Sequence, residues 1–481
     1  MSSPQETSLL ESHPVTSIRP WSSLLIRDYR LIFITILCAN TSNNMRNVAS
    51  LYQVYQLSGS SVQLGLAGFF QAFPFIVFGL FGGVLADTLN RKKLIAITHT
   101  LNILPGVALG LLTITGAIQV WQINALNMVA SSLQVLGGPS RQAIIPGLVP
   151  QTLLLNAVTT ATLMMQSTQL TAPVIAGFVI DLFGVHASYF TDAALLVPSV
   201  ISALLIHASG QPQGQRRQIS WRSLIEGFEF LWHTRIILSL FLLDFFAVLF
   251  GFFRPILPIF ADAVFAVGAR GLGMLYAAPA IGALLGSGLL LAAGDIKRKG
   301  ALSIIVTLLF ALSLGLLGLS QTFWMGLFAV GALGFNDAIS VAIRRTVVQI
   351  LAPDDMRGRA TSFLTVFAQT TNATGAVIAG AGAALLGAPN AAWSVACCAR
   401  SPLSPHVGRF PSCGTIGRIR PDDRPVVRDA RAVILDVTLG EERHAFHLLG
   451  LRKHIEKSQA VGSIAGVYES IQIAGESHRL A

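Results

Sequence analysis

Long apolar runs fill the chain as far as about residue 388, and short polar connections separate them. The runs consist of Leu, Ile, Val, Phe, Ala and Gly, and each has roughly the 20 residues that a helix needs to cross a bilayer. They are continuous rather than alternating, which excludes membrane strands. We therefore predict eleven membrane-spanning helices, at residues 30–56, 62–86, 93–114, 119–139, 152–183, 187–207, 236–260, 268–294, 300–319, 323–343 and 359–387.

The composition agrees with this pattern. Hydrophobic residues make up 53% of the 481-residue chain and charged residues only 12%, with a mean hydropathy of +0.64. A soluble core could not bury so much apolar surface, so the predicted fold class is an all-α integral membrane bundle. The N-terminal segment before the first run is polar, and that run is long enough to span, so we expect no cleavable signal peptide. The 4 cysteines show neither a disulfide framework nor metal-ligand spacing, and we expect no bound metal.

Lys and Arg collect in alternate connections, which predicts the orientation in the membrane. The basic connections contain Arg19, Arg27 and Arg30; Arg91, Lys92 and Lys93; Arg141; Arg216, Arg217, Arg222 and Arg235; Lys297, Arg298 and Lys299; and Arg344, Arg345, Arg357 and Arg359. By the positive-inside rule, these connections and the N-terminus are cytoplasmic in a multi-pass protein of the cell (inner) membrane. Arg270 is the exception on the opposite side. The net charge of +10 is mostly this topology signal, so we expect no nucleic-acid partner.

An internal repeat divides the spans into two halves. Residues 140–150 align with residues 343–353, and at the same offset residues 166–177 align with residues 369–380. Duplicated halves are typical of secondary transporters, whose substrate site lies between the halves near the bilayer midplane. The predicted parts are a cytoplasmic N-terminal tail (1–29), a six-helix half (30–207), a cytoplasmic linker (208–235), a second half with five recognisable spans (236–390) and an atypical polar, basic tail (391–481).

Several motifs carry a resemblance to a known family. The turn between the second and third spans reads Gly-x-x-x-Asp-x-x-x-Arg-Lys, and it departs from the family pattern at Thr88 and Asn90. Residues 172–177 are similar to a fifth-helix antiporter motif, residues 353–359 to a turn before the eleventh helix, and residues 275–279 to the eighth helix of siderophore exporters. The chain thus resembles the major facilitator superfamily, and within it the multidrug and siderophore exporters of the enterobactin-exporter type. The resemblance implies two pseudo-symmetric six-helix halves, of which the twelfth helix is missing or replaced here.

The charged turn predicts a conformational latch. A carboxylate at Asp87, where the second span leaves the membrane, can accept charge-assisted hydrogen bonds from Arg or from helix-start amides. The eleventh span begins beside two bases, and a contact made in one conformation only would bias a two-state equilibrium. The latch residues are Gly83, Asp87, Arg91, Lys92, Arg357 and Arg359. The alternative is a solvated loop that only obeys the positive-inside rule.

The fifth span predicts a hinge at Pro173 and Gly177. Proline removes a backbone hydrogen bond and bends the span, and small neighbours let another helix approach closely. The eighth span offers a matching surface in Gly282, Gly286 and Gly288. Ordinary tight packing between membrane helices is the alternative.

Ionisable residues inside spans are costly, so they are candidates for a substrate cavity. Arg46 and Arg254 occupy corresponding positions on the first and seventh spans, which line the cavity in this superfamily. Two opposed cations would suit an anionic or catecholate-like substrate, with aromatic surface nearby. The predicted cavity residues are Asn43, Arg46, Asn47, Gln166, Phe250, Arg254 and Gln369. For Arg254, snorkelling of the side chain to the outer face is the alternative.

Asp244 and Asp337 are the candidate proton carriers. A carboxyl group in a poorly hydrated pocket can load and release a proton as water reaches it from either side. Each acid could instead be the structural partner of Arg46, Arg254 or a base at a helix end. The chain has no phosphate-binding Gly-Lys-Ser loop and no cluster of His, Cys and acid, so we expect neither ATP-driven transport nor an enzyme. The expected energy source is the proton gradient, with no cofactor.

Two classes of function follow. The first is a proton-coupled exporter of a small amphipathic molecule, a drug or a siderophore, acting as a monomer in the lipid bilayer. The second is a non-transporting remnant or membrane sensor with the same architecture, and an uptake permease is a further option within the transporter class. The basic tail contains no spanning run, which we interpret as sequence out of register with an ancestral twelfth helix or as a genuine extension.

Overall fold

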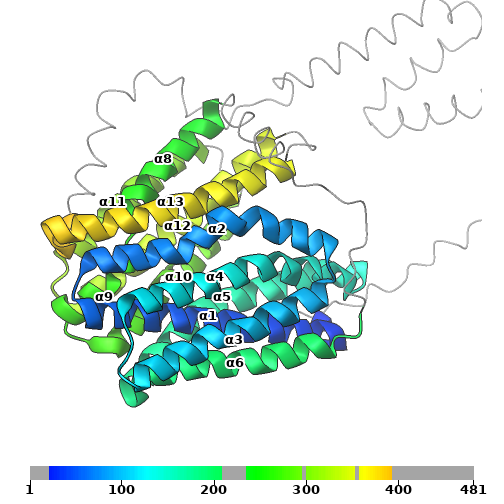
Figure 1. Cartoon of the computed structure of the whole chain (residues 1–481). Helices are drawn as coiled ribbons and strands as arrows, with labels where there is room; N and C mark the ends of the chain where they lie inside the picture. The colour runs from blue at the N-terminus through cyan, green and yellow to red at the C-terminus, as the bar shows by residue number, and fades with distance from the viewer. Residues whose placement is uncertain (1–20, 209–234, 295–298, 353–356, 393–481) are drawn as a thin grey trace, which may run out of the picture. The chain divides into compact units, whose positions relative to one another are not determined.

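The computed structural model describes residues 21–208, 235–294, 299–352 and 357–392, which all lie in one compact unit of the chain, residues 1–414. Every secondary-structure element in these ranges is a helix, which confirms the all-α fold (Figure 1). Most of the predicted N-terminal tail, linker and C-terminal tail lies outside the described ranges, at residues 1–20, 209–234 and 393–481.

Six long helices form the described part of the first half: α1 (Arg27–Ser58), α2 (Ser61–Thr88), α3 (Arg91–Ile114), α4 (Val120–Ala143), α5 (Leu154–Phe183) and α6 (Val185–Leu205). Short 3-10 turns precede α1 (η1, Ser22–Leu25) and connect α4 to α5 (η2, Ile145–Gly147; η3, Gln151–Leu153). Helix α1 ends at Gly59, whose φ of 59° favours glycine. The side chain of Asn90 caps α3 by accepting a hydrogen bond from the Lys93 amide at 3.2 Å.

The second half contains α8 (Arg235–Gly251), the short α9 (Leu257–Ile259), α10 (Gly268–Ala293), α11 (Lys299–Leu319), α12 (Phe323–Leu351) and α13 (Arg357–Leu386). The backbone is helical again over residues 388–392, where the described part ends. Ala388, Ala391 and Ala392 are buried in the main hydrophobic core. The eleventh span is therefore followed by the start of another helix.

The seventh span, predicted over 236–260, is not one continuous helix, although Asp244–Val264 is long and apolar enough to cross a membrane. Helix α8 stops at Gly251, and a 3-10 turn (η4, Arg254–Ile256), α9 and a π-helical turn (η5, Phe260–Val264) continue the path. Pro255 and Pro258 cause the break, because proline lacks an amide hydrogen and its ring clashes with the preceding turn. Interrupted helices in transporters commonly line the substrate path.

Eight helical segments in the described ranges are long and apolar enough to cross a membrane. Helices α1, α4 and α13 are long but are not among them, because polar side chains lower their hydropathy. Large apolar side chains such as Leu312, Trp324 and Phe328 are exposed on the outside of the bundle. A surface of this kind is the one that lipid covers in a membrane protein.

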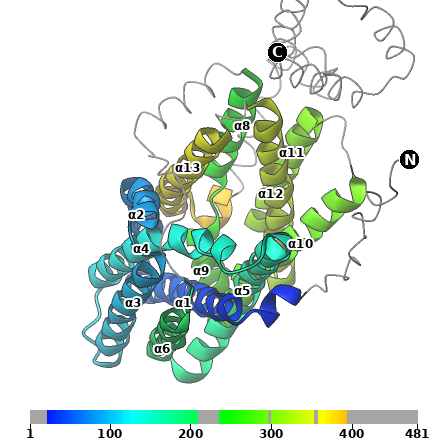
Figure 2. The same ribbon diagram turned by 90° about the vertical axis from the view of Figure 1, so that its right-hand side faces the viewer.

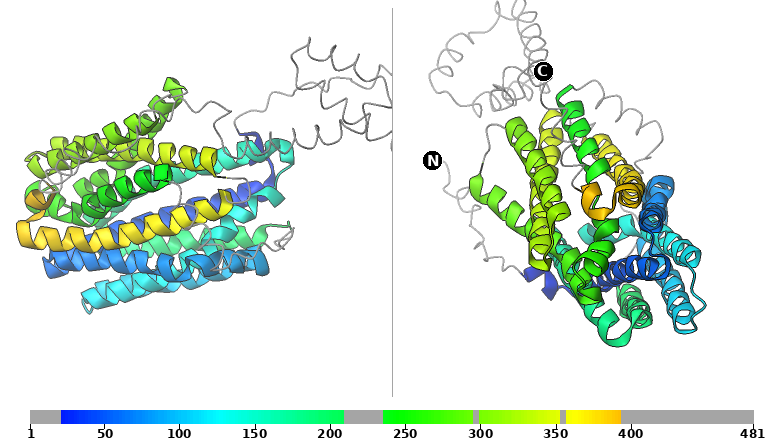
Figure 3. Two further views of the ribbon diagram at one scale, coloured as in Figure 1. Left: turned by 90° about the horizontal axis from the view of Figure 1, so that it is seen from above. Right: turned by 90° about the vertical axis from the view of Figure 1, so that its left-hand side faces the viewer.

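The two halves repeat one packing scheme. In the first half α2 packs on α4, α3 on α4 and α1 on α5, and in the second half α10 packs on α12, α11 on α12 and α8 on α13. The first half has additional contacts of α6 with α1 and α3. The halves meet along two crossings, α2 with α13 and α5 with α10 (Figures 1 and 2). The first crossing is also visible from above (Figure 3, left).

Glycines make both crossings possible. A Cβ atom at Gly65 of α2 would lie 2.7 Å from the carbonyl oxygen of Ala376 on α13, near Gly380. A Cβ atom at Gly177 of α5 would lie 2.6 Å from the carbonyl oxygen of Ala269 on α10, near Gly273. Such backbone contacts are typical of tightly packed membrane helices. Gly177 and Gly380 are repeat partners in the sequence alignment, so the same contact is built twice.

Candidate functional site

A narrow polar pocket lies between the halves, near the middle of α1, α5 and α10. Its lining comes from Asn44, Asn47 and Val48 on α1, Gln169 and Pro173 on α5, Arg254 on η4, and Tyr276 and Ala280 on α10. The Oδ1 atom of Asn47 is buried and has no hydrogen-bond partner. A buried polar atom without a partner is costly, so this carbonyl oxygen is available to a ligand.

The broken seventh span places Arg254 in this pocket. The side chain is half-buried, and the Tyr276 hydroxyl donates a hydrogen bond to the Arg254 carbonyl oxygen at 2.9 Å. This bond ties the 3-10 turn η4 to α10 of the same half. The structure thus places Arg254 in a pocket between the halves, which is where we predicted the substrate cavity.

The other predicted cavity residues are distributed unevenly. Asn47 lines the pocket, and Gln166 lies one helical turn from the pocket residue Gln169. Phe250 is 45% exposed and stacks on Phe246, while Gln369 accepts a hydrogen bond from Asn372 at 3.3 Å. Neither of these two residues lines the pocket. Their role in a substrate cavity stays a prediction.

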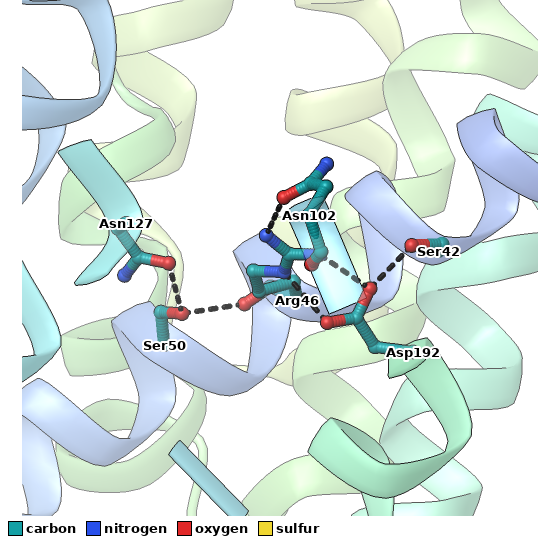
Figure 4. A network of polar contacts seen from close by, with 6 residues as sticks. All are labelled: Ser42, Arg46, Ser50, Asn102, Asn127 and Asp192. Atoms are coloured by element: carbon teal, nitrogen blue, oxygen red, sulfur yellow. Dashed lines mark hydrogen bonds and ion pairs between the residues drawn. The ribbon is translucent and has the colours of Figure 1, made fainter. Parts of the chain in front are cut away.

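Arg46 has a buried partner that our sequence reasoning missed. It is 3% exposed, and it forms an ion pair with the fully buried Asp192 of α6 (Figure 4). Its Nε donates to Asp192 Oδ2 at 2.6 Å and its Nη2 to Oδ1 at 2.9 Å, a bidentate arrangement. The Ser42 hydroxyl also donates to Asp192, and Arg46 Nη1 donates to Asn102 Oδ1 of α3 at 2.7 Å. Asp192 is an acid inside a predicted span, so the criterion that selected Arg46 could have found it.

The network continues toward α4. The Ser50 hydroxyl lies 2.7 Å from the Arg46 carbonyl oxygen and 3.2 Å from Asn127 Oδ1 (Figure 4). On the other side, Gly106 of α3 leaves room for the Asp192 carboxylate, since a Cβ atom there would lie 2.8 Å from Oδ2. Polar groups from four helices therefore surround one ion pair in the first half.

A second polar pocket adjoins this network. It is lined by Ala39 and Asn43 on α1, Thr98, His99 and Asn102 on α3, and Leu133, Gln134, Gly137 and Arg141 on α4. Asn102 belongs to both the pocket and the network. His99 is buried, and its Nδ1 lies 2.8 Å from Ser199 Oγ of α6. Asn43, predicted for the substrate cavity, lies in this pocket instead of the one between the halves.

The two predicted proton carriers differ in their surroundings. Asp244 of α8 forms an ion pair with Arg344 of α12, a base that we had counted in a cytoplasmic connection. Asp337 of α12 is exposed and has no hydrogen bond or ion pair with another residue in the described ranges, but it lies close enough to the Arg254 guanidinium to interact with its charge. Asp244 thus has a basic partner, as expected if it is a structural ion-pair residue instead of a proton carrier.

Contacts between the halves gather at the end of the bundle that holds the α1–α2 connection. Arg270 of α10 forms an ion pair with Asp181 of α5 at 2.7 Å, and its guanidinium lies 5.3 Å from the centre of the Phe178 ring. Gln56 of α1 donates to Asp262 of η5 at 3.0 Å. Arg270, the exception to the charge pattern, is therefore engaged in holding the two halves together.

The bases of the signature turn bind within the first half. Arg91 Nη1 donates to the Ala143 carbonyl oxygen at the end of α4 at 2.8 Å, and Lys92 Nζ donates to the Ile206 carbonyl oxygen after α6. Cations at helix C-termini stabilise the exposed carbonyl groups there. The side chains of Asp87, Arg357 and Arg359 lie outside the described residues, so the latch between the halves stays a prediction.

Two repeated helical halves around a polar pocket define a membrane transporter of the major facilitator type. The chain belongs to the transmembrane secretion effector family of this superfamily, whose model matches residues 18–402. It is similar to the enterobactin exporter EntS of Shigella dysenteriae serotype 1 (strain Sd197), with 27% identity over 376 residues, 78% of this chain and 86% of the relative. EntS of Escherichia coli O81 (strain ED1a) matches with the same identity and coverage. The family and these relatives are transport proteins, which makes the chain a transporter.

Solved structures share the fold. The nucleoside transporter NupG superposes with a TM-score of 0.60 at 16% identity, covering 78% of this chain and 96% of that one. A bacterial homolog of the human lysosomal transporter Spinster, in an inward-facing and unoccupied conformation, superposes with a TM-score of 0.60 at 16% identity, covering 75% and 83%. At this identity the likeness shows the fold alone.

Proposed function

We propose that the protein exports a small amphipathic molecule, a drug or a siderophore, across the inner membrane by alternating access. The observation that carries the proposal is the polar pocket between the two halves, near the middle of the helices that form it. The proton gradient supplies the energy, and no cofactor is required. The protein works as a monomer with its N-terminus in the cytoplasm. The similarity to the enterobactin exporter supports a siderophore among the candidate substrates.

The chemistry of the pocket fits an anionic or aromatic substrate. The Arg254 guanidinium offers charge-assisted hydrogen bonds, and Tyr276 adds an aromatic ring. The free Oδ1 of Asn47 accepts a hydrogen bond from a substrate hydroxyl. A substrate that carries both phenolic hydroxyls and negative charge would use all three residues.

The contacts at the α1–α2 end support alternating access. By the charge pattern this end faces outside, and there Arg270 binds Asp181 and Gln56 binds Asp262 across the halves. A rocking motion that admits substrate from one side requires such contacts to break when the outer side opens.

Transport by reconstituted protein tests the proposal. The full chain in proteoliposomes, with an imposed pH gradient, should move enterobactin or ethidium against its concentration gradient. Arg254→Gln should reduce the rate of transport by at least tenfold, because it removes the pocket's cation. The matched control is Arg345→Gln, an exposed base on α12 outside the pocket, which should transport at the wild-type rate. Movement only toward the inside would identify an uptake permease, and no movement of either probe would favour a remnant or sensor.

A further inference from the structure

We propose that Asp192 is the carboxylate that binds the coupling proton, in competition with Arg46. The inference rests on proton-coupled transport as proposed above, and it names the group that carries the proton. Asp244 is also paired with an arginine, Arg344, but its side chain is 22% exposed, against 0% for that of Asp192, and Asp337 is exposed.

Stability alone does not account for the Arg46–Asp192 pair. Removing two charges from water costs several kcal/mol per ion, and well-packed apolar residues in place of such a pair are often equally stable or more stable. Ionisable residues inside membrane spans are, by default, candidates for a functional site. Both members of this pair are almost completely buried, and they lie in the middle parts of α1 and α6.

The surroundings fit both charge states of the carboxylate. In the ionised state Asp192 accepts hydrogen bonds from Arg46 and Ser42, in the space that Gly106 leaves open. When a proton from water binds one carboxylate oxygen, the Arg46 guanidinium loses its counter-ion. Its Nη1 still donates to Asn102 Oδ1 at 2.7 Å, so the guanidinium keeps a polar partner. The Arg46 guanidinium therefore keeps a hydrogen-bond acceptor whether Asp192 is ionised or protonated.

The balance of charge links proton binding to conformation. The pair is neutral before the proton binds and carries one positive charge afterwards. An unpaired guanidinium in a dry interior is strongly disfavoured, so Asp192 binds the proton only when water reaches Arg46. The second pocket provides the route, because Asn102 lies both in its wall and in contact with Arg46.

Few other charged or titratable groups face this site. On α3, His99 lies in the second pocket and contacts Ser199 of α6, and on α4 Arg141 lies in the same pocket. On α6 itself, the Tyr189 hydroxyl lies one turn before Asp192 and donates to Gln53 Oε1 at 2.8 Å. Helix α5 carries one charged residue, Asp181, which is paired with Arg270. Among the acids in the described residues, Asp192 is thus the one that contacts this network.

Helix α1 connects the proton site to the substrate pocket. Asn43 lines the second pocket, Arg46 holds Asp192, and Asn47 lines the pocket between the halves. These residues lie within about one helical turn of one another. Release of Arg46 from Asp192 therefore acts on the same turn of helix that presents Asn47 to the substrate.

Infrared difference spectroscopy on the purified full chain, without substrate, tests the proposal. As the pH falls, the wild type should gain the carbonyl stretching band of a protonated, poorly hydrated carboxyl group. Asp192→Asn should lose this band, and Asp337→Asn should keep it. In Arg46→Gln the band should form at a proton concentration at least about tenfold lower, because the competing cation is gone. Loss of the band in Asp337→Asn, its persistence in Asp192→Asn, or its absence from the wild type would overturn the proposal.

Two further measurements separate failure of the proton site from misfolding of the variant and from failure of the proposed function. The double variant Arg46→Gln/Asp192→Asn removes both charges and keeps polar groups of similar size, so it should fold where Asp192→Asn alone does not, and it should still lack the band. Transport of enterobactin and ethidium is measured on the same preparations. If the wild type moves neither probe yet shows the Asp192 band, the proposed function fails while the proton site stands.

Discussion

The two halves share one packing scheme but differ in where they bury charge. In the first half, Arg46, Asp192 and Asn102 join α1, α3 and α6 through a buried ionic network. In the second half, the Asp244–Arg344 pair joins α8 and α12, and its side chains are 22% and 14% exposed. Glycine contacts occur in both halves: a Cβ atom at Gly82 of α2 would clash with the Val135 carbonyl oxygen of α4, and one at Gly286 of α10 would lie 2.6 Å from that of Phe335 on α12. The repeat has therefore kept the backbone contacts, while the fully buried ionic network belongs to the first half.

The largest effect should come from breaking the network of the first half. Asp192→Ala leaves the Arg46 guanidinium buried without its counter-ion, which should destabilise the protein by about 3–5 kcal/mol. Unfolding of the purified protein in detergent, followed by circular dichroism, measures the loss. Asp337→Ala in the second half is the matched control, since Asp337 is exposed and forms no hydrogen bond or ion pair with the described residues. Equal destabilisation by the two variants would contradict the contrast between the halves.

A smaller effect should follow from crowding the second half. Gly286→Ala places a methyl group against α12 and should cost about 1–3 kcal/mol through overpacking. Gly288→Ala lies on the same helix with open space around its Cβ position, and it should stabilise the protein by about 0.5–1 kcal/mol. Thermal unfolding of the two variants side by side gives the comparison. If both shift the unfolding temperature in the same direction, the glycine contact is not what holds α10 to α12.

The smallest effect on stability concerns the ion pair between the halves. The side chains of Arg270 and Asp181 are 46% and 39% exposed, so Arg270→Ala should cost only about 0.2–1 kcal/mol. Its effect on conformation should be larger, because the contact exists only while the α1–α2 end is closed. Labelling of a cysteine placed at Ala280, a buried residue of the pocket between the halves, should become faster in Arg270→Ala and return toward the wild-type rate in the charge swap Arg270→Asp/Asp181→Arg. Unchanged labelling in Arg270→Ala would show that the pair does not control closure.

The sequence predicts the positions of the helices well, because an apolar run of spanning length leaves few alternatives. It fails where the outcome depends on contacts across the bundle. Our prediction that Gly282, Gly286 and Gly288 face the fifth span is wrong, since Gly177 meets Ala269 and Gly273 instead. Small residues lie on more than one face of α10, so the sequence alone does not show which face meets α5.

The charged residues show the same limit. Arg46 stands out as an ionisable residue in a span, but its partner lies 146 residues away on another helix, and only packing brings the two together. From the sequence, the Arg254 side chain could extend to the outer face or into a cavity between the halves. The helix break at Pro255 places it in the pocket between the halves. The sequence thus indicates which residues are costly, while the structure shows what each of them contacts.

The proton flux that accompanies substrate movement tests most directly whether Asp192 carries the coupling proton. Proteoliposomes containing the full chain and an internal pH-sensitive dye are given an enterobactin gradient. The wild type should couple substrate movement to proton movement in the opposite direction, and Asp192→Asn should lose the substrate-dependent proton flux. A substrate-dependent proton flux in Asp192→Asn equal to that of the wild type would contradict a proton site in the first half.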